Sequence, residues 1–408
     1  MRKNGIDKTL TKIDGGICAP NGFRACGVSL NENGNKNDVA LIVSDKRFPS
    51  AAVFSSNALI GGYSLKNKAH LTAGYAQALL LYNGTLVKNL SFNEREARGL
   101  FQTLADKCGC AETQALIAPV GKIQCPLPAV LLEKAIDALL QSLGNTNEHS
   151  LAAAVALADT QTGAKQAAYS FSLGDVPCKI GAIFKGGNAG SEQSQATVCV
   201  LTTDVEISPQ MLDKALCSAF GETFDMLALN QNGSPSDFVY ITASGGAGNY
   251  RISAPDQEYK KFCDALKRVL YAICIELSRP ESEDEKRLLC CVENAKSKKI
   301  AKQLCRAIVS SERIKRHLQA RQADLEGILC ALGAGDESIR LENTEIVISS
   351  ALGEVVLWDF GGATMVAKPL VARVLNTDEI QITARLQQGN YDATALARTG
   401  VYLSTSKA

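Results

Sequence analysis

The segment from Lys185 to Asp204, KGGNAGSEQSQATVCVLTTD, constrains the fold of this chain more than any other. It begins as a glycine-rich, polar stretch, which is typical of a loop, and continues into the apolar run VCVLTT. A short apolar run that is rich in β-branched residues predicts a buried strand, here Thr197–Thr202. The chain therefore passes from a loop directly into the interior of a sheet, and Ala196-Thr197 lies at that junction.

A threonine at such a junction suits one kind of chemistry, provided that the Ala196–Thr197 peptide bond is broken. Thr197 then becomes a chain terminus, whose hydroxyl is a nucleophile and whose own α-amine is the base. The amide nitrogen of the intact chain takes no proton, whereas an α-amine titrates near ~7.7–8.0 and serves as a base at neutral pH. The alternative is an ordinary β-branched residue that begins a core strand, which is the more frequent meaning of an isolated Ala-Thr.

The composition is that of a sizeable globular protein. The 408 residues are enough to bury a large core, and charges of both signs nearly balance, giving a formal net charge of +1. This argues against a strongly basic surface of the kind that binds nucleic acid or an anionic membrane. No apolar run reaches the length of a membrane span, and the first residues, MRKNGIDKTLTK, lack an apolar signal core, so we expect a cytoplasmic protein.

The 14 cysteines are interpreted as reduced thiols. Most of them lie in apolar or helical patterns, where a thiol behaves as a small apolar side chain. Cys108 and Cys110 form the one tight pair, but no second pair follows at zinc-ribbon spacing, and the histidines are only His70, His149 and His317. We therefore expect no metal site.

Alternating patterns predict a layered α/β or α+β fold. The expected strands are Ala40–Ser44, Ala78–Tyr82, Ala115–Ala118, Thr197–Thr202, Phe238–Thr242, Leu288–Val292, Glu345–Ile348 and Val355–Trp358. The expected helices are Glu94–Lys107, Pro128–Leu143, Pro209–Phe220, Gln257–Leu277 and Ala301–Val309. Leucine and isoleucine recur at the spacing of one helical face between Leu132 and Leu143, so this helix should pack on a sheet. Ser208-Pro209 supplies an N-cap and a proline at the first helical position.

Several motifs, taken in order, resemble the ornithine acetyltransferase (glutamate N-acetyltransferase) family of arginine biosynthesis over nearly the whole chain. The motifs are APNGFRACGV (19–28), ALIVSD (40–45), AAVFSSN (51–57), PLP (126–128), Asp159-Thr160, IGAIFKG (180–186), Ala196-Thr197 followed by Thr202-Thr203-Asp204, and ASGGAG (243–248). Members of this family cleave themselves and use the new N-terminal residue as the nucleophile. The resemblance implies sheets sandwiched between helix layers, in an N-terminal-nucleophile-like ornithine acetyltransferase fold.

By this resemblance, Thr197 is the nucleophile and Ala196–Thr197 is the cleavage site. Cleavage would leave an α chain of residues 1–196 and a β chain of residues 197–408 that share one core, because Thr197–Val200 would lie inside it. Two such pairs are expected to form a heterotetramer. The partners are expected to be small molecules, N-acetylornithine and glutamate, with no nucleic acid and no membrane. The acyl group is held covalently, so no metal or organic cofactor is required, although acetyl-CoA would be an alternative acetyl donor.

The family's oxyanion hole is a threonine-glycine pair before a VPLP-like segment, and Val120-Gly121 occupies this place here. Gly121 can present its backbone N–H to a developing oxyanion, but Val120 lacks the hydroxyl donor. Loss of one such donor costs about 2.7–4 kcal/mol of transition-state stabilisation. The alternative interpretation of Val120-Gly121 is a plain turn at the end of a strand.

Two positions match substrate-binding residues of the family. Thr160, in DTQTGAK, matches a threonine, and Lys185 matches a lysine whose ammonium would pair with a substrate carboxylate. The stretch from Lys185 to Thr197 is one residue longer than the family pattern. The alternative for Lys185 is a solvated loop charge.

Other positions depart from the family pattern. Ser282 replaces a glutamate that would hold a substrate amine, and Glu281 and Glu283 stand on either side of it as candidates to compensate. This charged run is otherwise read as a solvated loop. The asparagine and threonine that close the family's substrate pocket fall near Gly400 and Thr405, of which only the threonine has a plausible counterpart.

The stretch NQNGSPSD keeps Ser234 and Asp237 of the corresponding family segment. Asn230, Asn232 and Asp237 are candidates to hydrogen-bond near the nucleophile. The commoner meaning of Asn-Gly-Ser-Pro is a plain turn.

Three functions are compatible with the sequence. We favour an acetyltransferase of the cyclic arginine pathway that moves acetyl from N-acetylornithine to glutamate through an acetyl-Thr197 intermediate. The second is a related enzyme with a changed acyl or amide substrate, and the third is a non-catalytic paralogue with a structural or regulatory role. Val120 and Ser282 are the residues that favour the second and the third.

Overall fold

The computed structural model divides the chain into two compact units. It describes residues 10–30, 38–58, 60–83, 94–121, 129–158, 165–186, 196–229, 234, 236–336 and 338–400. The first unit takes the described parts of 1–187, 193–219 and 232–269, and the second takes those of 220–231 and 270–408. None of the helices described combines the length and the apolar character that crossing a membrane requires.

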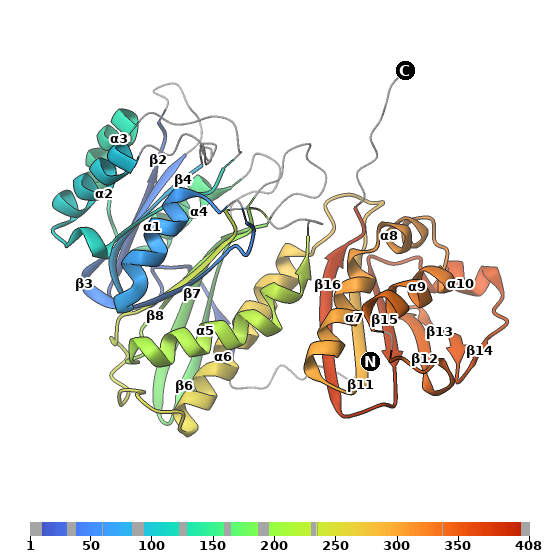
Figure 1. Cartoon of the computed structure of the whole chain (residues 1–408). Coiled ribbons are helices and arrows are strands. Elements are labelled where there is room, and N and C mark those ends of the chain that lie inside the picture. The colour runs from blue at the N-terminus through green and yellow to red at the C-terminus, as the bar shows by residue number, and fades with distance from the viewer. Residues whose placement is uncertain are drawn as a thin grey trace, which may run out of the picture. The chain divides into compact units, whose positions relative to one another are not determined.

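A nine-stranded sheet forms the centre of the first unit (Figure 1). Its strands are β1 (Thr11–Ile13), β2 (Phe23–Val28), β3 (Val39–Phe54), β4 (Tyr75–Tyr82), β5 (Ala115–Pro119), β6 (Lys165–Leu173), β7 (Val176–Lys185), β8 (Val198–Thr203) and β10 (Phe238–Ala243). The order is β1-β6-β7-β8-β10-β3-β4-β5, with β2 paired to β3. The long strand β3 belongs to two halves of this sheet, and its pairing with β4 shifts register between Val43 and Phe48.

Six helices of the described chain pack against the two halves of this sheet. They are α1 (Gly62–His70), α2 (Glu94–Cys108), α3 (Ala129–Gln141), α4 (Asn147–Leu157), α5 (Pro209–Glu222) and α6 (Gln257–Leu277). One core cluster joins α2 and α3 to the half that contains β2, β4 and β5. A second cluster joins α4 to strands of both halves. On the other half, the ring of Phe262 in α6 lies 6.4 Å from that of Phe171 in β6, and α5 runs beside α6 (Figure 1).

The second unit contains a seven-stranded sheet in the order β14-β13-β12-β15-β11-β16-β9. The strands are β9 (Leu227–Ala228), β11 (Arg287–Ala295), β12 (Glu345–Ser350), β13 (Gly353–Asp359), β14 (Gly362–Ala363), β15 (Glu379–Arg385) and β16 (Tyr391–Arg398). The helices are α7 (Lys298–Ser310), α8 (Glu312–Gln319), α9 (Leu325–Gly335) and α10 (Lys368–Val374). The Ser297 hydroxyl accepts a hydrogen bond from the N–H of Ile300 and so caps α7, which packs its apolar face on β11 and β16.

The mixed α/β class and the sheets between helix layers are confirmed in the first unit. Every strand and helix expected from the sequence is present, with shifts at the ends. The expected helix Pro128–Leu143 is described as Ala129–Gln141, and the expected strand Thr197–Thr202 begins one residue later, at Val198. The Ser208 hydroxyl accepts a bond from the N–H of Met211, as the expected N-cap requires.

Two glycines of the first unit provide a test of this packing. A Cβ on Gly27 in β2 would lie 2.1 Å from the carbonyl oxygen of Ala152 in α4, whereas a Cβ on Gly99 in α2 would meet no heavy atom within 4 Å. We expect Gly27→Ala to lower the free energy of unfolding by about 1–3 kcal/mol, because α4 must move away from the sheet.

The matched control, Gly99→Ala, should raise the free energy of unfolding by about 0.5–1 kcal/mol, because it removes a flexible residue from a helix interior. Urea unfolding of both variants measures the two effects. Equal stabilities for both variants would contradict the placement of α4 against β2.

Candidate functional site

Thr197 lies immediately before β8, a strand in the middle of the larger sheet. Strand β8 pairs antiparallel with β7, where Lys185 stands opposite Val198, and parallel with β10, where Phe238 stands opposite Val198. The last residue of β7 and the first residues of β8 and β10 therefore lie side by side. This arrangement brings together Lys185, Thr197 and Asp237, which are far apart in the sequence.

The backbone of Thr197 is held on both sides by the segment that leads into β10. Its N–H donates to Oδ1 of Asp237 at 2.8 Å, and its carbonyl oxygen accepts from the N–H of Phe238 at 3.1 Å. Ala196 is fully buried and Thr197 is half-buried. The peptide bond that we expect to be cleaved thus has its alanine in the core and its nitrogen bound to a carboxylate.

Asp237 is therefore a neighbour of the expected nucleophile, and this prediction is confirmed. Burial raises the pKa of its carboxyl group from 3.8 to about 6, and backbone hydrogen bonds from Thr197 and Ser234 oppose that rise. At neutral pH the group is mainly ionised. The other two candidates, Asn230 and Asn232, lie outside the described residues.

Lys185 is the last residue of β7 and is buried, with 3% of its surface exposed. The alternative of a solvated loop charge is therefore wrong. Its position at the end of β7, beside the start of β8, is consistent with a binding role. Thr160 and Thr405, the other expected substrate-binding residues with side-chain hydroxyls, lie outside the described residues.

Val120 packs in the same core cluster as Ala196 and Val198, although β5 and β8 are not neighbouring strands. The two halves of the sheet bring these residues together from opposite faces of one core. Val120 donates its N–H to the carbonyl oxygen of Tyr82 at 2.9 Å, so that this N–H continues the pairing of β4 with β5. Val120 therefore has no hydroxyl, and its N–H is already bound, so that neither group can donate to an oxyanion. Gly121, also buried, follows it.

The remaining predicted positions lie in the second unit. Ser282 and Glu283 are exposed in a turn before β11. Glu281 forms an ion pair of 2.5 Å with Arg398, whose side chain is 2% exposed. The charged run is therefore only partly a solvated loop, and Glu281 is committed to a buried arginine rather than held ready for a substrate amine. The sequence carries no signal for Arg398 because this contact depends on the pairing of β11 with β16.

Gly400 lies beside the same turn. The carboxylate of Glu285 occupies the space that a side chain at position 400 would take, since a Cβ there would be 2.1 Å from Oε1. The N–H of Lys286 donates to the Thr399 hydroxyl at 2.8 Å, and the N–H of Thr399 donates to the Lys286 carbonyl at 2.9 Å. These bonds bring the positions of Ser282 and Gly400 to one end of the smaller sheet.

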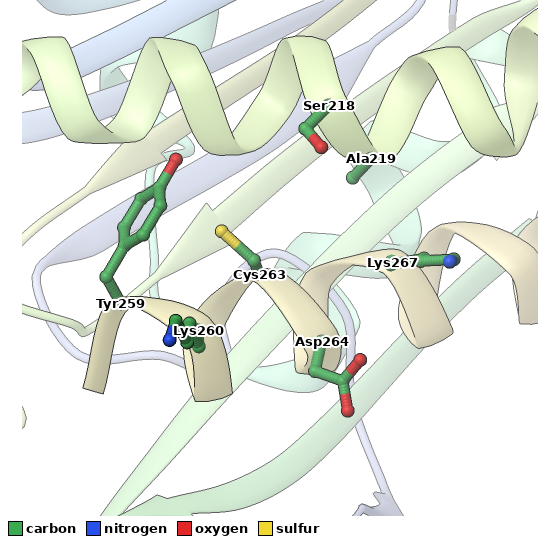
Figure 2. Close-up of a pocket in the computed structure, with 7 residues that line it drawn as sticks. All are labelled: Ser218, Ala219, Tyr259, Lys260, Cys263, Asp264 and Lys267. Atoms are coloured by element: carbon green, nitrogen blue, oxygen red, sulfur yellow. The ribbon is translucent and has the colours of Figure 1, made fainter. Parts of the chain in front are cut away.

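A separate pocket of about 210 Å³ lies between α5 and α6 (Figure 2). It is lined by Ser218, Ala219, Tyr259, Lys260, Cys263, Asp264 and Lys267. Figure 2 shows the side chains of Tyr259 and Cys263 directed towards α5 and that of Asp264 directed away from it. None of these residues belongs to the predicted site. Within the part of the chain that the structure describes, no cluster of three or more histidine, cysteine, aspartate or glutamate residues has a geometry that would hold a metal ion.

The family model and the relatives that this chain resembles point to the same family. The sequence model of the ArgJ family matches residues 23–399. The arginine biosynthesis bifunctional protein ArgJ of Symbiobacterium thermophilum is 28% identical over 389 residues, which cover 94% of this chain and 95% of the relative. The glutamate N-acetyltransferase of Methanocaldococcus jannaschii is 24% identical over 393 residues, which cover 93% and 94%.

Among solved structures, the arginine biosynthesis bifunctional protein ArgJ of Bacillus halodurans is similar with a TM-score of 0.45 and 24% identity, over 50% of this chain and 92% of that one. The family match extends over both units, from β2 to the end of β16. The chain belongs to the ArgJ family.

Proposed function

We propose that this protein is an acetyltransferase of arginine biosynthesis, which cleaves itself at Ala196–Thr197 and then moves acetyl from N-acetylornithine to glutamate. One observation carries the proposal: Thr197 enters a central strand with its nitrogen bound to Asp237 and with Lys185 beside it. Membership of the ArgJ family, in which relatives are named glutamate N-acetyltransferase or bifunctional ArgJ, supports the choice of reaction.

Self-cleavage would begin with attack of the Thr197 hydroxyl on the carbonyl carbon of Ala196. The C–N bond breaks, the nitrogen takes the hydroxyl proton, and the resulting ester is hydrolysed by water. The products are a carboxylate on Ala196 and a free α-amine on Thr197. Strands β7 and β8 would then belong to different chains, residues 1–196 and 197–408, which the hydrogen bonds between these strands hold together.

Acetyl transfer would use the same atoms. The Thr197 hydroxyl takes the acetyl group from N-acetylornithine and ornithine leaves; glutamate then takes the acetyl group from the ester. Gly121 would donate its N–H to the oxyanion of each step, because the N–H of Val120 is committed to Tyr82. Lys185 would pair with a substrate carboxylate. The covalent ester carries the acyl group, so the reaction needs no metal or organic cofactor, and acetyl-CoA is an alternative donor.

The remaining parts of the proposal concern assembly and recognition. Thr160, Ser282, Glu283, Gly400 and Thr405 are assigned to substrate binding by the family resemblance. Two cleaved pairs would form a cytoplasmic heterotetramer.

A second candidate is an enzyme of the same mechanism with a different acyl or amide substrate. It is favoured by Ser282 in place of a glutamate and by the ion pair of Glu281 with Arg398, because only Glu283 of the three candidate positions then offers a carboxylate to a substrate amine. This candidate would be favoured if the protein is cleaved but does not transfer acetyl from N-acetylornithine.

The first prediction concerns Thr197. Incubation of the purified protein with N-acetylornithine alone should add one acetyl group to the fragment that begins at Thr197, and glutamate should remove it. Thr197→Ala should abolish both cleavage and acetylation, since it removes the nucleophile. Intact-mass analysis measures both.

Thr203→Val is the matched control, because Thr203 is a buried threonine at the other end of β8 whose hydroxyl donates to the Lys179 carbonyl. It should still be cleaved and acetylated. Acetyl transfer by the Thr197→Ala variant would contradict the proposal.

The second prediction concerns Val120. Val120→Thr changes little in volume and returns a hydroxyl to the oxyanion position, so cleavage and transfer should become faster, by up to about 10²-fold. The rate of acetyl transfer to glutamate measures the effect. Val200→Thr places the same hydroxyl in the same core cluster and should only destabilise the protein. If neither variant is faster, position 120 does not face the oxyanion.

A further inference from the structure

The contact between Asp237 and Thr197 is fixed by the main chain on both sides. The parallel pairing of β8 with β10 places residue 237 next to residue 197, and the Phe238 N–H holds the Thr197 carbonyl. Asp237 is itself anchored: its N–H donates to Ser234 at 3.1 Å, and its carbonyl oxygen accepts from the N–H of Ser55 at 2.9 Å. The carboxylate therefore has little freedom to leave the nitrogen of Thr197.

The nitrogen of Thr197 changes its chemical nature in the proposed reaction. In the intact chain it is an amide with one hydrogen, which it donates to Oδ1 of Asp237, and the nitrogen lies 2.8 Å from that oxygen. After cleavage it would be an amine that must take a proton from its own hydroxyl. An amine that keeps one N–H directed at Asp237 has its lone pair directed elsewhere, which is the requirement for a base that serves the hydroxyl of the same residue.

We propose that Asp237 is the positioning residue of this site: it orients the α-amine of Thr197 and stabilises the ammonium that forms during acyl transfer. This inference rests on the proposed function. Asp237 would have the place of the third group in a nucleophile–base–orienter arrangement, which directs the base but takes no proton itself.

One proton moves in each stage of acyl transfer to Thr197. As the bond from Oγ of Thr197 to the acyl carbon forms, the hydroxyl proton passes to the α-amine and produces an ammonium beside the ionised Asp237. As the acyl C–N bond of the donor breaks, the ammonium returns that proton to the leaving amine. The carboxylate accepts an N–H hydrogen bond throughout, so its charge is constant.

Other charges near this nitrogen must be considered in any titration. From β7, Lys185 stands opposite Val198 in the sheet. From α1, the ammonium of Lys68 lies 5.6 Å from the ring centre of Phe54, whose own ring is 5.3 Å from that of Phe238. A cation close to the α-amine would lower its pKa, whereas Asp237 would raise it. A comparison of variants at position 237 keeps both lysines constant.

The test is a titration of the Thr197 α-amine in the cleaved protein. The protein is exposed briefly to an amine-acylating reagent at pH values between about 5 and 10, a range that includes the ordinary pKa of an α-amine. The labelled fraction is then read from the N-terminal fragment ions of the peptide that begins at Thr197, which separate a label on the α-amine from one on the first lysine, Lys214. We expect Asp237→Asn to lower the titration midpoint by about one pKa unit or more, because an opposite charge at this distance is lost.

Asp204→Asn is the matched control. Asp204 is a buried aspartate whose Oδ1 accepts the N–H of Lys179 at 2.7 Å, but it follows the other end of β8, about 20 Å from Thr197. Its variant should keep the wild-type midpoint. Coinciding midpoints for Asp237→Asn and the wild type would overturn the inference. In acetyl transfer, Asp237→Asn should lower kcat with little change in KM for the acetyl donor.

The outcomes separate this inference from the proposed function. If the protein is cleaved but transfers no acetyl group, the proposed reaction is wrong. The titration still tests the role of Asp237, because it requires only the free α-amine of Thr197. If Asp237→Asn is not cleaved, Asp237→Glu decides: cleavage restored by this second carboxylate supports the inference, and an uncleaved Asp237→Glu overturns it. A wild-type chain that stays intact overturns both.

Discussion

The arrangement of this site depends on the burial of β8 between β7 and β10. All residues of β8 are buried, and hydrogen bonds to two neighbouring strands fix where the strand begins. A slip of one residue would turn every side chain of β8 to the opposite face, which the two-sided core does not permit. The position of Thr197, the contact of its nitrogen with Asp237 and the approach of Lys185 all follow from this register.

In this architecture, the groups that the site keeps and the groups that it lacks lie in different places. The groups that would act on the nucleophile itself are present and held by the backbone. Two of the departures from the family pattern are at Val120, where a hydroxyl is missing, and at Ser282, where a carboxylate is missing. Loss of the hydroxyl costs rate, by about 2.7–4 kcal/mol if nothing replaces it, but leaves the chemistry itself intact. In the proposed function, the loss of the carboxylate at Ser282 would affect which substrate is bound.

The sequence predicted the parts of the site that depend on local patterns. The apolar run after Ala196 predicted the strand, and the retained Asp237 was one of three candidates to hydrogen-bond near Thr197, beside the alternative of a plain turn. The burial of Lys185, the commitment of the Val120 N–H to Tyr82 and the pairing of Glu281 with Arg398 were not predicted. Each of these depends on which distant strands become neighbours, and no local pattern of residues encodes that choice.

The intact mass of the freshly purified protein under denaturing conditions shows whether the chain cleaves itself. We predict two fragments, one ending at Ala196 and one beginning at Thr197, because the proposed nucleophile, the buried Ala196–Thr197 bond and the proposed Gly121 donor suffice for self-cleavage. A single species of full length would mean that the α-amine never forms. That result would contradict self-cleavage and favour a non-catalytic role for the same fold.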